Sequence, residues 1–458
     1  MSNDDTRSYY VGVDVGATKT LAAAVKPSGK VRGRARRATP RTDDPQDTLG
    51  VIFGAIDKAV DKAGVTLDQV SAIGLAVAAV VDPDAGKVVA TPNMNLAGLD
   101  VVAPLEDRYS KPVALGNDVN MGTLGEQWLG AGRYLNHVLG MFIGTGIGGG
   151  MIIDGKLVRG RRELAGEVGH MVMVPDGPLC GCGNRGCLEA LASRTAIERD
   201  IRQAIADGRE SVIAEQLGDS DARIRSKMLW RALKGGDAVV TEVMTRAAEY
   251  IGRACVNIQH LLDPEVIILG GGVIQACGKF MVPAIRKVVD GDAYLSSSAS
   301  GTIVPSELGD DAVVLGAVAL ARQAAGDAPL REASDTCPDY PHIEYATFGE
   351  IAVGDKVYSQ DIYIRGDGKV KKRKAKIAKA AYGSLHKIGP AELDRICRGN
   401  PKVVVVGMGQ NGMAVLAPEA EEMLRQRGIV VHSLPNAKAV RQYNRLTGRK
   451  AAVFHVTC

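Results

Sequence analysis

The sequence predicts an α/β protein through about residue 324, followed by a separate, smaller α+β module. Apolar strands alternate with helical patterns in the first part, which is the order that builds a sheet covered by helices. Beyond a proline-containing segment, short alternating strands with Gly-Asp turns favour antiparallel pairing. We therefore expect two domains, at 1–324 and 343–458, joined by a linker at 325–342.

The elements of the first part follow from its hydrophobic pattern. YVGVDVGATKTLAAAV at 10–25 and VLGMFIGTGIGGGMIIDG at 138–155 each read as a strand, a glycine turn and a returning strand. They predict two β-hairpins of similar design. The other predicted elements are, in order, a polar segment at 30–47, a helix at 48–64, a buried strand at 72–77, a strand ending at Asp118, helices at 119–129 and across 189–262, a strand with a glycine turn at 265–273, and a closing helix at 311–324.

Composition narrows the functional class. Of the 458 residues, 46% are hydrophobic and 24% charged, as in globular proteins. The net charge of +4 is small for this length, so we do not expect a nucleic-acid partner. No run of about 18 apolar residues occurs, and MSNDDTRSYY lacks the features of a signal peptide. We expect a cytoplasmic protein without membrane contact.

Two glycine-rich turns are candidates for phosphate binding. In the turn after Asp14, small residues allow backbone N–H groups to approach phosphate, and Thr18 and Lys19 add donors. Asp14 could hold Mg²⁺, although a hairpin turn that merely needs glycine remains the alternative. The run Gly144–Gly150 weakens a strand and indicates a close approach of the backbone to another group. Gly271 and Gly272 offer a third such place, suited to an adenosine.

Three of the eight cysteines lie within eight positions. Cys180, Cys182 and Cys187 follow His170, and together they form a Cys₃His set suited to tetrahedral Zn²⁺. Such a site has no open position, so it would be structural. The alternative is a loop of reduced thiols.

Carboxylates supply the candidate catalytic groups. Asp118 closes an apolar strand, where the sites of α/β proteins usually lie, and could accept the proton of a substrate hydroxyl. The alternative is a helix-capping role for Asp118. Asn117, Glu167 and Glu189 are suited to hydrogen bonds with a polyol, or the two glutamates are ordinary surface charges.

These segments resemble the ROK family of sugar kinases, which has the actin/hexokinase-like (ribonuclease H-like) two-lobed fold. The resemblance covers about residues 9–324 and rests on DVGATKT, GND, GTGIGGG and GEVGH followed by CGCGNRGCLE. It implies that Asp118 is the catalytic base, that zinc is structural, and that the protein is a homodimer. The implied sugar-binding residues are Asn117, Glu167, His170 and Glu189. The implied contacts to ATP and Mg²⁺ are Asp14, Gly16, Thr18, Lys19, Thr145, Gly146, Gly271 and Gly272.

Two departures from the family pattern concern the sugar. Ala78-Ala79 stands where Pro-Gly is frequent, and Asn93–Leu99 replaces an NxPGW segment. We expect glucose as the substrate, with an N-acetylhexosamine or fructose as alternatives and polyphosphate as an alternative donor. A non-catalytic sugar sensor is the competing reading. Because about nine residues precede the first strand, we do not expect the helix-turn-helix of ROK repressors.

The C-terminal module resembles the Mth938-like domain of unknown function. The matching segments are FGEIAVGDKVYSQDIYIRGDGKVKKR, VVVVGMGQNGM and LRQRGIVVHSLPNAKAVRQYN. We interpret GMGQNG as a strand-to-turn glycine set, with an anion cradle as the alternative. The basic run Lys369–Lys379 is read as a solvated strand or loop.

Overall fold

The computed structural model describes residues 8–42, 44–91, 94–133, 135–217, 223–295, 302–327, 340–399, 401–410, 412–446 and 448–457. Asn93 and most of the predicted linker lie outside the described residues. The chain divides into two compact units, one mainly within residues 1–332 and one mainly within 333–458. No helix in the described ranges combines the length and apolar character needed to cross a membrane.

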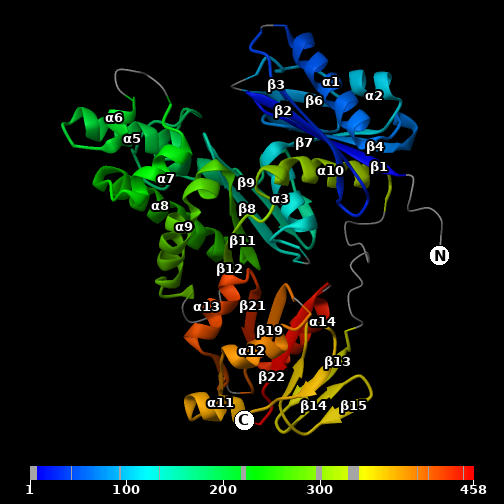
Figure 1. Cartoon of the computed structure of the whole chain (residues 1–458), viewed down its shortest axis with the longest axis vertical. Helices are drawn as coiled ribbons and strands as arrows, with labels where there is room; N and C mark the ends of the chain where they lie inside the picture. Colours follow the sequence, from blue (N-terminus) through cyan, green and yellow to red (C-terminus); the bar gives the residue numbers. More distant parts are fainter. Residues whose placement is uncertain are drawn as a thin grey trace. The chain divides into compact units, whose positions relative to one another are not determined.

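The first unit contains two five-stranded sheets with the same strand order. The first is β3-β2-β1-β4-β7 and the second is β10-β9-β8-β11-β12, both visible in Figure 1. Their strands are β1 (Tyr9–Val15), β2 (Lys19–Val25), β3 (Val31–Ala38), β4 (Val70–Val77), β7 (Val113–Asn117), β8 (Val138–Ile143), β9 (Ile147–Ile153), β10 (Lys156–Val158), β11 (Val266–Gly270) and β12 (Thr302–Pro305). In both sheets the first two strands form an antiparallel hairpin and the fourth strand runs parallel to the first. The two predicted hairpins are thus confirmed.

Two helices lie between the sheets, α3 (Asp118–Leu129) against the second sheet and α10 (Ala312–Ala324) against the first (Figure 1). Glycines allow their close packing: a Cβ on Gly316 would lie 1.7 Å from the Met121 carbonyl oxygen, and one on Gly74 of β4 would lie 1.8 Å from that of Ala317. Helix α3 begins at Asp118, directly after β7, and the contact with α10 holds this helix in place.

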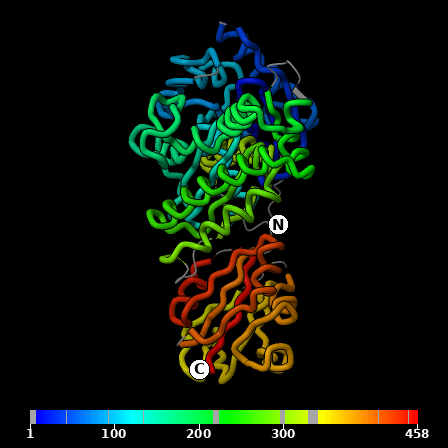
Figure 2. The backbone as a smooth tube through the Cα atoms, turned by 90° about the vertical axis from the view of Figure 1, so that its left-hand side faces the viewer, coloured from blue at the N-terminus to red at the C-terminus, as the bar shows by residue number. Residues whose placement is uncertain are grey.

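The outer faces of the sheets are covered by the remaining helices. Helix α1 (Pro45–Ala63) packs on β2 and β3, and α2 (Ala103–Tyr109) joins the same core. The larger cover of the second sheet consists of α4 (Leu188–Ala192), α5 (Arg194–Ala206), α6 (Val212–Leu217), α7 (Ser226–Lys234), α8 (Ala238–Leu262) and α9 (Gly271–Asp290). These are the green helices that face the viewer in Figure 2.

The sequence prediction is wrong at two places in this unit. The segment 30–47, read as merely polar, contains strand β3. Its Gly33 and Ala35 face α1 while Arg32, Arg34 and Arg36 are exposed, as is common on an edge strand. The glycines after β11 do not form a turn, because Gly271 begins helix α9.

The second unit is an α+β module, as predicted. Its main sheet has the order β17-β16-β22-β19-β21, and a three-stranded sheet has the order β13-β14-β15. The elements are β13 (Ile343–Thr347), β14 (Glu350–Val353), β15 (Lys356–Tyr358), β16 (Ile362–Ile364), β17 (Val370–Lys372), α11 (Lys376–Tyr382), β18 (Lys387–Ile388), α12 (Pro390–Ile396), β19 (Val403–Gly407), β20 (Val415–Leu416), α13 (Pro418–Gln426), β21 (Val430–Leu434), α14 (Asn436–Arg445) and β22 (Lys450–Phe454).

Candidate active site

Asp118 lies at the junction of β7 and α3, and the preceding residue, Asn117, caps the helix. The Asn117 Oδ1 accepts hydrogen bonds from the backbone N–H groups of Val119 at 2.9 Å and Asn120 at 3.1 Å, as an N-cap does. The Asn117 Nδ2 donates to the Ala79 carbonyl at 3.1 Å and to the Asp118 Oδ1 at 3.2 Å. Because Asn117 caps the helix, the Asp118 carboxylate is not needed for that purpose.

Two aspartates of this site have pKa values well above the ordinary value of 3.8. Burial, together with the smaller effects of the nearby Asp14 and Glu167 charges, raises the pKa of Asp118 from 3.8 to about 7. Burial also raises the pKa of Asp14 to about 6, against the lowering effect of Lys19. Carboxylates that attract protons near neutral pH are typical of acid–base sites.

Glu167, His170 and Glu189 lie next to these aspartates. The pKa of Glu167 is raised by burial and by Glu189, against the lowering effect of His170. The His170 Nε2 lies 3.9 Å from the Glu167 Oε2. The Glu189 Oε2 accepts from the Ile147 N–H at 2.8 Å, which ties α4 to the start of β9.

The four predicted zinc ligands converge. One ligand atom from each of His170, Cys180, Cys182 and Cys187 lies within 4.8 Å of all the others. Two sulfur ligands at the usual Zn–S distance of about 2.3 Å lie about 3.8 Å apart on a tetrahedron. The Sγ atoms of Cys182 and Cys187 are 3.7 Å apart, and the Cys180 Sγ is 3.7 Å from the His170 Nδ1. The donor set therefore fits Zn²⁺, and the two nitrogens of His170 face the cysteines and Glu167 separately.

The glycine run between β8 and β9 is explained mainly by packing. A Cβ on Gly148 would lie 2.6 Å from the Val119 Cγ2, and one on Gly150 would lie 2.4 Å from the Thr123 Oγ1, both on α3. A Cβ on Gly146 would lie 2.2 Å from the Glu189 Oε2. The close approach predicted for this run is therefore to α3 at Gly148 and Gly150, and to Glu189 at Gly146.

The other predicted nucleotide contacts occupy three loop ends. Gly16 and Thr18 form the β1–β2 turn, held by the Thr39 side chain on the Gly16 carbonyl at 2.7 Å. A Cβ on Gly271 would lie 2.4 Å from the Ile143 carbonyl, so the start of α9 lies beside the end of β8. Gly272 is less crowded, with the Ser226 Oγ at 3.9 Å.

Electrostatic and hydrogen-bond contacts join one group of the predicted site residues. The group consists of Asp14, Lys19, Asn117, Asp118, Glu167, His170 and Glu189.

Sequence reasoning missed two polar neighbours of the site. The charge of Asp310, on the turn before α10, raises the pKa of Asp14. The Arg194 guanidinium donates to the Thr145 Oγ1 at 2.6 Å. Neither residue belongs to a motif, although Arg194 begins α5 directly beyond the cysteine loop and α4.

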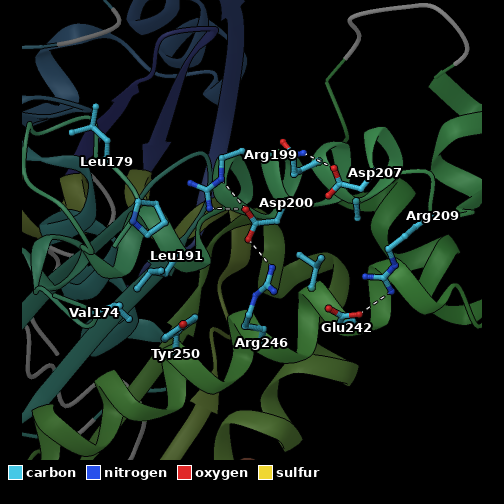
Figure 3. A pocket seen from close by; sticks show the side chains of 14 residues that line it. Val174, Leu179, Leu191, Arg199, Asp200, Asp207, Arg209, Glu242, Arg246 and Tyr250 are labelled. Atoms are coloured by element: carbon cyan, nitrogen blue, oxygen red, sulfur yellow. Dashed lines mark hydrogen bonds and ion pairs between the residues drawn. The ribbon is translucent and has the colours of Figure 1, made fainter. Parts of the chain in front are cut away.

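A separate groove of about 710 Å³ lies between α5, α8 and the loop before the cysteines (Figure 3). Its polar lining is largely paired: Asp200 binds Arg199 and Arg246, and Arg209 binds Glu242. None of the predicted site residues lines it. It is therefore distinct from the carboxylate site.

Two sheets of equal strand order, each beginning with a hairpin and separated by paired helices, define the actin/hexokinase-like fold. Residues 10–324 match the ROK family, and the chain belongs to that family. Residues 343–456 match a family described as "Protein of unknown function (DUF498/DUF598)". Both resemblances inferred from the sequence are thus confirmed.

The relatives include kinases and repressors. The glucokinase of Thermotoga maritima is 34% identical over 69% of this chain and 98% of its own length. A ROK glucokinase from Streptomyces griseus, solved with glucose and AMPPNP, is 32% identical with a TM-score of 0.59, over 69% of this chain and all of that one. The xylose repressor of Caldicellulosiruptor bescii is 30% identical over 61% of this chain and 69% of its own length.

Proposed function

We propose that this protein phosphorylates a hexose, glucose in the first place, with ATP as donor and Asp118 as general base. The observation that carries the proposal is that Asn117 and Asp118 have separate roles at the β7–α3 junction. Asn117 performs the capping, and the Asp118 carboxylate is kept half-buried beside other carboxylates, with its pKa raised to about 7. A group that only senses sugar has no use for a proton acceptor tuned to neutral pH.

The remaining roles follow from position. Asn117, Glu167, His170 and Glu189 would hold sugar hydroxyls beside Asp118. Asp14 would bind Mg²⁺, which would neutralise phosphate charge. The bound cation would also favour the ionised form of Asp14, whose pKa is raised without it. Gly16, Thr18, Lys19, Thr145 and Gly146 would contact the phosphates, and Gly271 and Gly272 the adenosine.

Zinc would be structural in this scheme. With His170, Cys180, Cys182 and Cys187 as ligands, it would fix the His170 ring through Nδ1 while Nε2 faces Glu167. The ion would thereby hold one wall of the sugar site in place. It supplies no step of phosphoryl transfer.

We further propose the domain limits 1–324 and 343–458 with the linker 325–342, a homodimer, and a cytoplasmic location. An N-acetylhexosamine or fructose remains the alternative acceptor, because the segments around Ala78 and Asn93 differ from the family pattern. Polyphosphate remains the alternative donor.

The test is ADP release over a panel of hexoses and N-acetylhexosamines, on wild type and Asp118→Asn in parallel. We expect activity on one sugar, reduced about 10²–10⁴-fold in the variant, as for loss of a general base. Zinc content and unfolding temperature serve as controls. If folded, zinc-loaded wild type binds a sugar in calorimetry but turns none over, the protein is a sugar sensor and the proposal fails.

A further inference from the structure

The turn between β8 and β9 is held by the residues that begin helix α5. The Arg194 N–H donates to the Gly144 carbonyl at 3.0 Å. The Thr195 hydroxyl donates to the Thr145 carbonyl at 2.8 Å. The Gly144 N–H donates to the Gly146 carbonyl at 2.8 Å. All three carbonyls of the turn therefore accept a hydrogen bond from the protein.

The hydrogen-bond donors of the same turn are free. Within the ranges that the structure describes, the N–H groups of Thr145 and Gly146 reach no protein acceptor, and neither does the hydroxyl hydrogen of Thr145. The Thr145 side chain is exposed. Successive backbone N–H groups without protein acceptors bind anions in many loops. A turn with occupied carbonyls and free donors is thus suited to an anion rather than to a cation.

Arg194 adds a positive charge to these donors. Its Nη2 donates to the Thr145 Oγ1 at 2.6 Å, and the residue is half-buried. A guanidinium has five N–H donors, and no carboxylate among the described residues forms an ion pair with Arg194. The other two arginines of α5, Arg199 and Arg202, each pair with a carboxylate of that helix. Arg194 is therefore held by a neutral hydroxyl, and its charge and most of its donors are available to a ligand.

The turn lies next to two of the predicted binding places. Directly after it, the Ile147 N–H donates at 2.8 Å to the carboxylate of Glu189, a predicted sugar ligand. Directly before it, the Ile143 carbonyl would lie 2.4 Å from a Cβ on Gly271, a predicted adenosine contact. In a kinase the phosphate chain of the donor joins these two places. Because like charges repel, an anion beside Glu189 also requires a nearby cation, which Arg194 supplies.

We propose that Arg194 binds the phosphate chain of the phosphoryl donor, together with the N–H groups of Thr145 and Gly146. This role rests on the proposed function, since Arg194 acts on the donor of the same reaction. The ligand class is a triphosphate chain, whether it belongs to ATP or to polyphosphate. A planar guanidinium can donate to two phosphate oxygens at once. The Thr145 hydroxyl holds the guanidinium beside the turn before the donor binds, and Arg194 forms no covalent bond with the donor.

The test compares wild type with Arg194→Gln by calorimetric titration of the full chain in the absence of sugar. The backbone bond from residue 194 to Gly144 remains in the variant. The ligands are MgATP, magnesium tripolyphosphate and adenosine. We expect the variant to bind MgATP about 10–100-fold more weakly, as for the loss of hydrogen bonds to a charged group, and to bind adenosine as wild type does. Tripolyphosphate that binds wild type as tightly as MgATP, and is equally weakened in the variant, would identify polyphosphate as the source of the chain. Binding of MgATP alone would identify the nucleotide.

Three further variants separate binding of the donor from support of the turn. Arg194→Lys keeps the charge and should recover part of the lost MgATP affinity. Thr195→Val removes the bond to the Thr145 carbonyl without a change of charge, so it should not weaken MgATP relative to adenosine. Arg209→Gln is the matched control, because it changes an arginine of the same unit that pairs with Glu242. It should bind all three ligands as wild type does.

Equal MgATP affinity in wild type and folded Arg194→Gln would overturn the assignment. So would a loss of affinity that is the same for adenosine and MgATP, since Arg194 would then only support the turn. Folded wild type that binds neither phosphate ligand would overturn it as well. The proposed function fails on a different result: wild type that binds MgATP through Arg194 but phosphorylates no hexose would contradict sugar phosphorylation and support the role of Arg194. Active wild type whose MgATP affinity does not depend on Arg194 would do the opposite.

Discussion

The raised pKa of Asp118 predicts how activity depends on pH. A base with a pKa of about 7 is about 9% ionised at pH 6 and about 91% ionised at pH 8. Because only the ionised form accepts the sugar proton, kcat/KM should rise about tenfold over this range. An aspartate with the ordinary pKa of 3.8 would give no change in kcat/KM between pH 6 and pH 8.

The perturbation that isolates this effect is Glu167→Gln, which removes a neighbouring negative charge. Burial is the largest cause of the raised pKa. The pH at which kcat/KM reaches half of its maximum should therefore fall by less than about one unit. The readout is the midpoint pH of the rise in kcat/KM, measured by coupled ADP release. This midpoint is informative even if the variant also binds sugar more weakly. A profile that is flat from pH 6 to 8 in active wild type would refute the assignment.

The same shift predicts a cost in stability. The folded state holds the Asp118 proton up to about pH 7 and the unfolded state only to 3.8. Stability is therefore lost as pH rises between these values, and the loss is complete above pH 7. The difference of about 3 units corresponds to at most about 4 kcal/mol. Asp118→Asn should thus gain stability over wild type as pH rises from 4 to 7, in denaturant unfolding.

Three further predictions concern metal, packing and charge. A chelator or Cys182→Ser should remove zinc, lower the unfolding temperature and weaken sugar binding through His170, whereas Cys277→Ser, outside the cluster, should keep the metal. Gly316→Ala should destabilise by about 1–3 kcal/mol, because its Cβ would lie 1.7 Å from a carbonyl of α3; Gly50→Ala, exposed on α1 with nothing within 4 Å, should not. Arg373→Met should cost about 3–5 kcal/mol in the unfolding of the second unit, since it removes the buried guanidinium that pairs with the carboxylates of Asp361 and Glu392, and should spare sugar phosphorylation.

A different result would contradict each of these three predictions. Unchanged stability and sugar affinity after loss of the metal would mean that zinc has no structural role. A Gly316→Ala protein as stable as Gly50→Ala would mean that α3 and α10 separate readily. Calorimetry of Arg373→Met that shows no lowered transition would mean that the buried charges are solvated.

The parts of the fold that could be read from the sequence are those with local signals. The two hairpins, the β7–α3 junction and the cysteine loop each lie within one short segment, so their spacing reveals them. Strand β3 was missed because its outward positions are arginines and its inward positions are Gly33 and Ala35, which carry little hydrophobic signal. The sequence offers Asp118 as a possible helix cap, and only the three-dimensional contacts show that Asn117 performs this role.

The glycine run after β8 shows a deeper limit of sequence reasoning. Glycines reveal that something approaches the backbone closely, but not what approaches it. At Gly148 and Gly150 the neighbour is helix α3, and at Gly146 it is the carboxylate of Glu189. The run therefore helps to fix the position of Asp118, at the start of the same helix. A turn that binds phosphate and a close contact with a helix both call for glycine, so the sequence pattern could not distinguish them.

The buried contact between Asp361 and His455 lies beyond any spacing rule for the opposite reason. Asp361 and His455 are 94 positions apart, and no motif joins them. Only the antiparallel pairing of β16 with β22 brings the start of one strand to the end of the other. In both units, polar side chains gather where strands end. The cysteine loop and the β7–α3 junction can be recognised within short segments, whereas the contact between Asp361 and His455 depends on sheet topology and is visible only once the strands are placed.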